Sequence, residues 1–325
     1  MAKLNLVSAI NLALDQEMAR NDKIVLLGED VGTEGGVFRV TEGLQQKYGA
    51  HRVVDAPLAE AGIVGTAFGL ALGGMLPVPE IQFEGFLYPA LNQLCNHAAR
   101  YRNRTRGQRP VRMVLRCPWG GGIRAPEHHS DSPETLVVHT PGLTVVTPSN
   151  PYDAKGLMTA ALRHPDPVVF CEPKRIYRAI RQEVPEEDYL VPIGKAAVVR
   201  EGKDATLVAW GAMVREASAA ADLLAEEGIG VEVIDLRTLS PMDSAAVVAS
   251  VGKTGRLVVA HEAPRTLGLG AEISARVTEE VLTRLLAPVV RVTGFDTVMP
   301  LAKLENHYLP DAARIAEGVR KALAF

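Results

Sequence analysis

Cysteine is scarce in this chain of 325 residues. Its three cysteines, Cys95, Cys117 and Cys171, lie far apart and form no CxxC pair. Their spacing does not suit a zinc site, and it favours buried reduced thiols over a disulfide framework. The net charge is also low, because 35 Lys and Arg stand against 38 Asp and Glu, which gives −3. A balance so near neutrality offers no basic stripe, so we expect no nucleic-acid partner.

Long apolar runs are absent as well. No stretch approaches the roughly 18 residues that a membrane-spanning helix needs, so we expect no membrane partner. The opening residues, MAKLNL, resemble neither an apolar secretion signal nor an Arg-rich transit peptide, which predicts a cytoplasmic location. A hydrophobic content of 47% is nevertheless ordinary for a folded chain, and it excludes a disordered or collagen-like one.

Several motifs of nucleotide-binding and hydrolytic enzymes are missing too. The sequence contains no Walker P-loop, no HExxH and no GxSxG elbow. The nearest approach to GxGxxG, at residues 69–74, falls inside a predicted helix instead of following a strand. An independent dinucleotide-binding oxidoreductase would therefore lack its required fingerprint.

What the sequence does contain is a regular alternation of short β-branched runs and amphipathic, Ala-rich stretches. These patterns predict helices at residues 5–19, 61–72, 89–102, 152–163, 214–227 and 312–322, and strands at residues 23–27, 53–54, 78–82, 111–115, 143–146, 168–171, 205–210, 231–234, 257–260 and 289–292. Such alternation is typical of parallel sheets covered by helices on both faces. Residues 173–192 are charged and contain several prolines, which predicts a linker. We therefore predict an α/β protein with two doubly wound domains, residues 1–190 and 191–325.

In open parallel sheets, ligands bind beyond the carboxyl ends of the strands. Four segments of the predicted first domain lie at such ends: residues 28–30, 57–62, 82–86 and 119–131. One carboxylate, Glu60, begins a helix with no other charge for over a turn. It either interacts with the helix dipole or acts as a dehydrated acid beside a flat ligand, and the local residues alone favour the first interpretation.

The segment at residues 119–131 combines three consecutive glycines with two adjacent histidines, His128 and His129. Adjacent histidines point in different directions and no Cys or Asp set stands at ligand spacing, so we predict no metal site here. A histidine can act as an acid or base without such a set, because its pKa lies near neutrality. A histidine that is merely exposed on a loop is the equally simple alternative.

Longer motifs resemble one known family along essentially the whole chain. They stand at residues 27–32, 57–65, 80–83, 127–134, 153–157, 172–178, 233–239, 253–256 and 261–264. Together they are similar to the beta subunit of the thiamine-diphosphate-dependent 2-oxo acid dehydrogenases of the pyruvate and branched-chain complexes. The resemblance implies a transketolase-like pyrimidine-binding domain followed by a transketolase C-terminal-like domain.

The resemblance also implies partners and cofactors. In this family the beta subunit forms an alpha2beta2 heterotetramer with an alpha subunit, and thiamine diphosphate is shared between the two. The GDG…N motif that holds the diphosphate and Mg²⁺ on alpha is absent here, so we expect alpha to hold the metal. The lipoyl acyltransferase core is expected to dock on the C-terminal domain, with Ala324 and Phe325 as part of that contact.

The same resemblance assigns roles to single residues. Glu60 corresponds to the carboxylate that promotes the imino tautomer of the aminopyrimidine, and His129 to the histidine that transfers protons during acylation of lipoamide. His128 is its less favoured neighbour. Cofactor contacts are expected from Leu58, Gln82 and Phe86, and Glu29 corresponds to a carboxylate of an acidic tunnel between active sites.

The resemblance further implies that the substrate is a small 2-oxo acid, which is oxidatively decarboxylated. Residues 129–134 and 172–178 lean slightly toward branched-chain acids, while residues 181–195 resemble enzymes for pyruvate, so pyruvate or acetoin dehydrogenase stays the alternative. Relatives often bind potassium near residues 161–166, but the pattern differs here and we do not predict that ion. A hypothesis of another class is a non-catalytic scaffold that only stabilises alpha.

Overall fold

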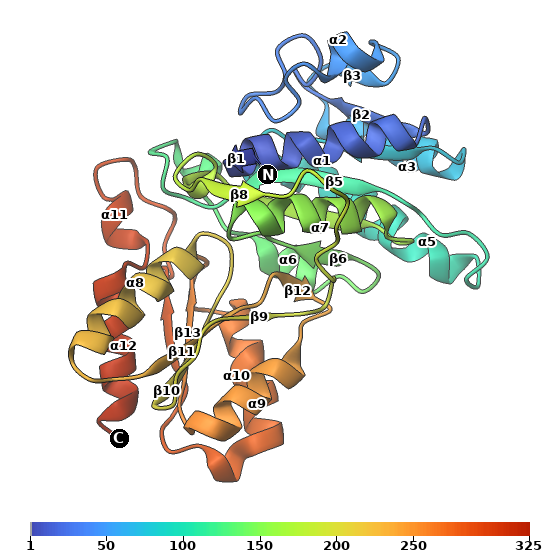
Figure 1. Cartoon of the computed structure of the whole chain (residues 1–325). Coiled ribbons are helices and arrows are strands. Elements are labelled where there is room, and N and C mark those ends of the chain that lie inside the picture. The colour runs from blue at the N-terminus through green and yellow to red at the C-terminus, as the bar shows by residue number, and fades with distance from the viewer. Residues whose placement is uncertain (1) are drawn as a thin grey trace. The chain divides into compact units, whose positions relative to one another are not determined.

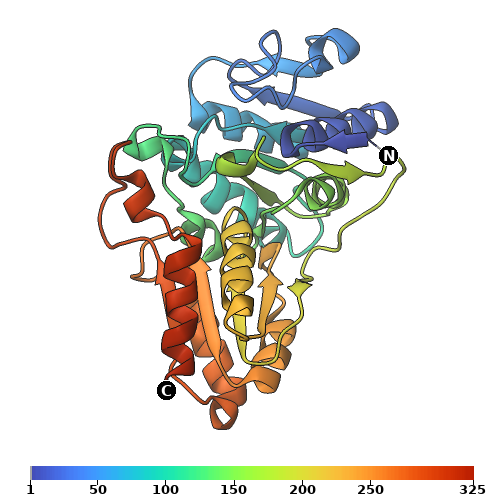
Figure 2. The same cartoon turned by 60° about the vertical axis from the view of Figure 1, so that its left-hand side comes forward.

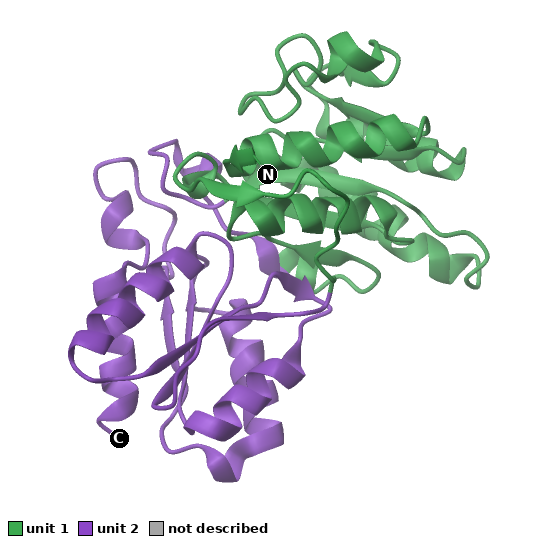
Figure 3. Ribbon diagram, viewed as in Figure 1, with its two compact units in different colours: residues 1–119, 136–193 green, residues 120–135, 194–325 purple. Residues whose placement is uncertain are grey.

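Strands and helices alternate along the computed structural model, which describes residues 2–325 (Figure 1). Contacts within the chain define two units (Figure 3). Unit 1 comprises the described residues up to Trp119 together with Leu136–Ile193, and unit 2 comprises Gly120–Thr135 and Gly194–Phe325. The loop with His129 thus groups with unit 2, contrary to its expected place in the first domain. The domain boundary at residue 190 remains a prediction.

The bounds of the elements follow the chain. Unit 1 contains β1 Ala2–Leu4, α1 Leu6–Arg20, β2 Ile24–Gly28, α2 Leu44–Tyr48, β3 Val53–Asp55, α3 Glu60–Leu72, β4 Leu76–Pro79, α4 Leu87–Leu91, α5 Ala99–Arg104, β5 Val114–Trp119, β6 Thr144–Val146, α7 Pro151–Arg163, β7 Val168–Pro173 and β8 Gln182–Val184. Unit 2 contains β9 Ala197–Arg200, β10 Ala205–Ala209, α8 Met213–Glu226, β11 Val231–Asp235, β12 Thr238–Ser240, α9 Ser244–Thr254, β13 Leu257–His261, α10 Leu269–Val281, β14 Val290–Thr293, α11 Glu305–Tyr308 and α12 Ala312–Leu323. The short helix α6, Glu134–Val138, spans a boundary between the two sets of residues.

The strands of unit 1 form parallel ladders in the orders β3-β2-β4 and β5-β7-β6. A parallel bridge between Glu80 and Arg116 links β4 to β5 and joins the two ladders. From β2 the chain turns to β3 on one side and later to β4 on the other. The carboxyl ends of β2 and β4 therefore form the topological switch point at which open α/β sheets bind ligands.

Helices α1 and α7 begin within about one residue of where the sequence predicts them. The Asn5 side chain accepts a hydrogen bond from the Ser8 N–H at 2.9 Å at the start of α1. Asn150 caps α7 in the same way, and Pro151 occupies the first turn. The two helices pack against each other, with Leu6, Ile10 and Leu14 of α1 fully buried.

Some expectations for unit 1 are wrong. The expected linker contains β8, which pairs antiparallel with β1. The residues after β8 are also held, because the Lys155 ammonium donates hydrogen bonds to the carbonyls of Pro185 and Glu187. The strand expected at 111–115 is β5, which begins at Val114, because its ladder partner β7 sets the register. The helix expected at 89–102 contains a π-helical stretch, Asn92–Ala98, which hydrophobic periodicity does not reveal.

The sheet of unit 2 has the order β14-β13-β10-β11-β9. The first four strands are parallel, and β9 pairs antiparallel with β11, which the sequence pattern did not predict. Helices α8 and α12 pack together on one face, and α9 and α10 pack together on the other (Figures 1 and 2). The switch point of this sheet lies between β10 and β13. No helix in the described part of the chain is long and apolar enough to cross a membrane.

Candidate functional site

An amide side chain ties together the strand ends at the switch point of unit 1. Gln82, which follows β4, donates from Nε2 to the Asp30 carboxylate at 3.1 Å and to the Glu29 carbonyl at 3.5 Å. A Cβ on Gly28 would lie 2.9 Å from the Glu80 carbonyl oxygen, so only glycine allows β2 to end this close to β4. Glu29 and Gln82 therefore lie together, as the sequence predicts for strand ends.

Glu60 is the first residue of α3 and exposes only 8% of its surface. The preceding Ala59 gives the helix no side-chain cap, so the carboxylate stands at the positive end of the helix dipole. Burial raises the pKa of Glu29, and the charges of Glu60 and Asp30 raise it further. Glu29, Asp30 and Glu60 thus interact electrostatically and make this end of the sheet anionic.

The two apolar candidates differ in their surroundings. Leu58 exposes 78% of its surface, so it is available to a ligand or partner and contributes little to the core. Phe86 ends a single 3-10 turn, Glu84–Phe86, and is half-buried. Its ring meets Phe83 edge to face at 6.4 Å, and Phe83 meets Phe38 in the same way at 5.4 Å. Phe86 therefore lies at the border of an aromatic cluster.

A buried ion-pair network lies at the bridge that joins β4 to β5, and sequence reasoning missed it. Arg116, 1% exposed, donates to both oxygens of Glu172 at 2.7 and 3.0 Å and also to Glu80. The Tyr177 hydroxyl completes the set by donating to Glu172 at 2.7 Å. The available signal was a charged residue inside each of three apolar strand-like runs.

The pKa directions in this network show which effects dominate. Burial raises the pKa of Glu80 even though Arg116 opposes the shift. Burial alone would lower the pKa of Arg116, but the charges of Glu172 and Glu80 raise it overall. Lys174 forms a second fully buried ion pair with Glu84, the residue that begins the 3-10 turn ending at Phe86. Buried charge pairs at Glu80 and Glu84 thus fix the segment that contains Gln82, and Phe86 follows it directly.

His129 lies in unit 2, at the end of the 3-10 turn Glu127–His129. Its ring meets that of His128 edge to face, with centroids 4.1 Å apart and planes at 80°. The His129 side chain is half-buried, whereas that of His128 is exposed. A hydrogen bond from the Gly120 N–H to the Asp131 carbonyl at 3.1 Å closes the loop that carries both rings.

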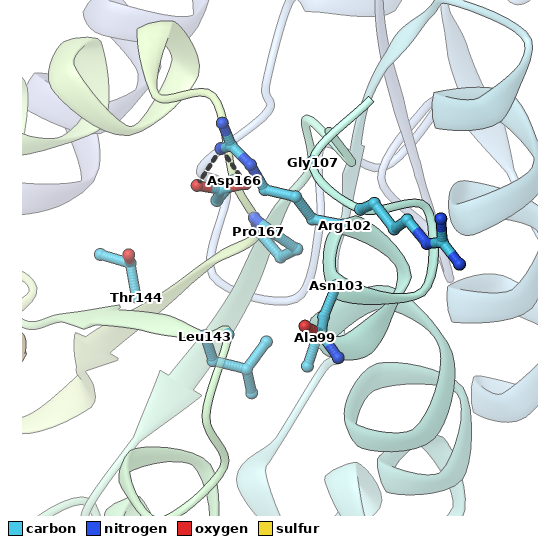
Figure 4. Close-up of a pocket in the computed structure, with 10 residues that line it drawn as sticks. Ala99, Arg102, Asn103, Gly107, Leu143, Thr144, Asp166 and Pro167 are labelled. Carbon is cyan, nitrogen blue, oxygen red and sulfur yellow. Dashed lines mark hydrogen bonds and ion pairs between the residues drawn. The ribbon is translucent and has the colours of Figure 1, made fainter. Parts of the chain in front are cut away.

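The structure also contains a cavity of about 460 Å³ that includes none of the predicted site residues (Figure 4). Arg102 and Asp166 both line it and form an ion pair, in which the guanidinium donates to both carboxylate oxygens at 2.7 and 2.6 Å. Asp166 lies within residues 161–166, the region for which the family resemblance raised a potassium ion. Its charge is neutralised here by Arg102, so the cavity gives no reason to propose the ion.

Two family models match the chain. The model described as "Transketolase, pyrimidine binding domain" matches residues 2–179, and that described as "Transketolase, C-terminal domain" matches residues 194–315. The first match includes residues 120–135, which group with unit 2 by their contacts.

Similar proteins extend over nearly the same length. The chain is 56% identical to the pyruvate dehydrogenase E1 component subunit beta of Acholeplasma laidlawii, over 99% of this chain and 98% of that one. Identity to the proteins of the same name is 49% in Staphylococcus epidermidis and 48% in Bacillus subtilis, over the full length of each. Among solved structures, a split-gene transketolase described as an inactive beta4 tetramer matches with a TM-score of 0.82 and 26% identity, over 99% of both chains.

Proposed function

We propose a function from one premise: the chain belongs to the family of beta subunits of the thiamine-diphosphate-dependent 2-oxo acid dehydrogenases. The proposed function is that of the beta subunit of a pyruvate dehydrogenase E1 component, which decarboxylates pyruvate when joined to an alpha subunit. The observation that carries it is the buried carboxylate of Glu60, which interacts with Glu29 at the switch point where Gln82 also lies.

The proposed substrate differs from the one the sequence motifs favoured slightly. The relatives that are 48–56% identical over nearly the whole chain are named for pyruvate. They do not support the preference for branched-chain acids, and the pyruvate alternative takes its place.

The residues at the switch point fit the pyrimidine part of the cofactor. When bound, thiamine diphosphate would supply a nucleophilic thiazolium carbon and a cationic ring that takes up the electron pair released by decarboxylation. Glu60 is buried beside Glu29, whose pKa is raised partly by the Glu60 charge, so a protonated ring nitrogen next to Glu60 would relieve this repulsion. Glu60 is proposed to hold that proton, while Gln82, Phe86 and Leu58 contact the ring.

The same site does not suit the diphosphate. Glu29, Asp30 and Glu60 make the strand ends anionic, and like charges placed close together repel. In addition, residues 2–325 contain no group of three or more His, Cys, Asp or Glu side chains placed to hold a metal ion. We therefore propose that the alpha subunit binds the diphosphate and the Mg²⁺.

Exposed apolar side chains support the need for partners. Val298, Leu301 and Leu304 expose 74%, 68% and 57% of their surfaces within a short segment of unit 2. Phe325, the expected contact of the acyltransferase core, exposes 78%. Apolar groups gathered in this way mark interaction surfaces more often than free surface. The similar transketolase chain is described as inactive in its beta4 form, which supports activity only with alpha.

The first experiment is co-expression of the chain with its alpha subunit, followed by decarboxylation assays with pyruvate and with branched-chain 2-oxo acids. We expect a kcat/KM for pyruvate at least about tenfold higher, because the branched-chain acids carry two or three more carbons and a single methylene group already discriminates by about this order. Activity should require thiamine diphosphate and Mg²⁺. A preference for branched-chain acids would overturn the substrate, and no decarboxylation of either would favour the scaffold.

A second experiment separates the roles of the two units. His129→Ala should lower reductive acylation of the lipoyl domain by about a hundredfold, which is the usual contribution of a proton-transferring side chain. Turnover with an artificial electron acceptor and assembly with alpha should change far less. His139→Ala is the matched control, since His139 is an exposed histidine in the turn after α6 and has no part in the proposed site. Equal and slight effects on all three readouts would remove His129 from the mechanism.

A further inference from the structure

The loop that carries His129 is held by two carboxylates that are distant in sequence. Glu305 begins α11 and Glu262 follows β13, and both are buried, at 2% and 8% exposure. The two side chains accept hydrogen bonds from the backbone of residues 121–124. All of these residues belong to unit 2.

Glu305 binds the loop with both of its oxygens. Oε1 accepts from the Gly122 N–H at 2.7 Å, and Oε2 accepts from the Arg124 N–H at 3.0 Å. Gly120, Gly122 and Arg124 have φ values of +77°, +93° and +59°, so left-handed residues recur at alternate positions. Successive N–H groups in such a conformation form a concavity that binds anions, and here the chain supplies the anion itself.

Arg124 is the strained member of this loop. A non-glycine residue with positive φ is uncommon and persists only where its surroundings hold it. The charged acceptor Glu305 stabilises it, because hydrogen bonds to an ionised group are stronger than those between neutral groups. Arg124 is also exposed, so trypsin can reach the bond that follows it once the loop loosens.

Glu262 holds the neighbouring peptide. Its Oε2 accepts from the Gly121 N–H at 2.9 Å and from the Ser132 hydroxyl at 3.4 Å, so it contacts the loop on both sides of the histidines. A Cβ on Gly120 would lie 2.6 Å from this oxygen, and one on Gly121 would lie 3.0 Å from Met299. Gly120, which also has positive φ, is therefore the position at which a side chain would disturb the loop most, whereas a methyl group on Gly121 would need only small shifts of Met299 and Leu309.

We propose that Glu305 and Glu262 are positioning residues that fix the loop in the conformation in which His129 acts. This inference rests on the proposed function of His129 in acyl transfer. It explains why buried carboxylates, three glycines and a strained arginine are grouped in a loop that has no regular strand or long helix. The carboxylates act through His129 and are not themselves catalytic residues.

The test uses Glu305→Gln in the complex with alpha. Glutamine keeps one acceptor oxygen but presents an NH₂ group to a backbone N–H, so one hydrogen bond is lost. We expect kcat for lipoyl acylation to fall about tenfold while KM for the 2-oxo acid stays within about twofold. The reason is that the displaced His129 is proposed to act in acyl transfer, which follows binding of the 2-oxo acid. Tryptic cleavage after Arg124 should become faster. Glu305→Asp keeps the charge and should recover part of both losses.

The matched control is Glu279→Gln, on the exposed side of α10, which should leave kcat and cleavage unchanged. Size-exclusion chromatography verifies that each variant still assembles with alpha. If Glu305→Gln fails to assemble, Glu262→Gln supplies the same test through its contact with Gly121.

The decisive comparison is the double variant Glu305→Gln with His129→Ala. A residue that acts through His129 adds no further loss once the imidazole is gone, so the double variant should match His129→Ala alone. Multiplied losses would overturn the positioning role, as would normal acylation by Glu305→Gln beside an impaired His129→Ala. Normal acylation by His129→Ala would instead overturn the proposed role of His129, and unchanged cleavage after Arg124 would show separately that Glu305 does not hold the loop.

Discussion

The two units have sheets with the same kind of switch point, but they place different residues there. In unit 1, Glu29 and Gln82 follow β2 and β4, and both remain partly exposed. In unit 2, Trp210 follows β10 and His261 ends β13, and their rings stack with centroids 5.3 Å apart and planes at 17°. These two rings expose only 7% and 0% of their surfaces.

Packing closes the switch point of unit 2. A Cβ on Gly268 would lie 2.6 Å from the His261 ring and one on Gly270 would lie 2.9 Å from it, so the backbone at these glycines packs directly against the imidazole. Burial lowers the pKa of His261 to about 4, which keeps the ring neutral at neutral pH. The comparison teaches that topology marks where a ligand could bind, whereas accessible polar groups decide whether it does. In the proposed function we therefore expect unit 2 to act through the loop that carries His129 and not through its own switch point.

The largest effect is expected in unit 1, where one substitution should make its switch point as inactive as that of unit 2. Glu60→Gln removes the group proposed to hold the ring proton but keeps nearly the same volume. Decarboxylation by the complex with alpha should fall about a thousandfold, within the range of general acid–base contributions. Glu42→Gln, at an exposed position of unit 1, is the control and should be fully active. A Glu60→Gln enzyme with near-normal decarboxylation would contradict the proposed role of the carboxylate.

The second prediction concerns the charge pairs at the bridge between β4 and β5. Arg116→Met leaves Glu80 and Glu172 buried without their cation, and breaking a buried pair in this way costs about 3–5 kcal/mol. Urea unfolding of the variant should show the loss, whereas Arg109→Met, at an exposed position, should not. An equally stable Arg116→Met protein would mean that the pairs do not hold the strand ends.

Many of the elements and strand ends in this comparison could be predicted from the sequence. Hydrophobic periodicity located α1 and α7, and the Asn150–Pro151 pair marked the start of α7, because a cap acts within a few residues of where it stands. The strand ends with Glu29 and Gln82 followed from alternation alone. The identity of Glu60 and His129 as site candidates needed the family resemblance, since the local residues left simpler interpretations open.

The rest depends on contacts between distant residues. Nothing near residues 182–184 indicates that they pair with β1 at the start of the chain. Nor does the spacing of glycines and histidines reveal that the loop with His129 is held by Glu262 and Glu305. Arg116 shows the same limit, because its partners lie on two other strands. Local patterns predict elements well, while buried charges find their partners only in the folded chain.

The third prediction sharpens the comparison on the side of unit 2. The folded pKa of His261 is about 4 and its ordinary value is 6.5, so between these pH values the unfolded chain binds the extra proton. Stability should therefore fall as the pH drops from about 6.5 to about 4, by about 3 kcal/mol from this residue. His261→Phe keeps the stack on Trp210 and should remove this part of the slope. Unfolding of both proteins across that range measures it, and parallel pH profiles would contradict it.

The smallest effect has the opposite sign, and it tests whether the anionic strand ends of unit 1 are strained by their own charge. The pKa of Glu29 is raised above 4.5 by burial and by Glu60 and Asp30, so its charged form is the one the fold disfavours. The stability that Glu29 contributes is complete below about pH 4.5 and is lost as the pH rises through the raised pKa. Glu29→Gln cannot ionise, so its Tm should exceed that of the parent at neutral pH by about 1–2 °C and should match it under acid conditions. Scanning calorimetry at both pH values decides the sign. A variant that is less stable at neutral pH would show that Glu29 is stabilised by contacts that outweigh its repulsion, and the switch point would then hold its charges without needing a ligand to relieve them.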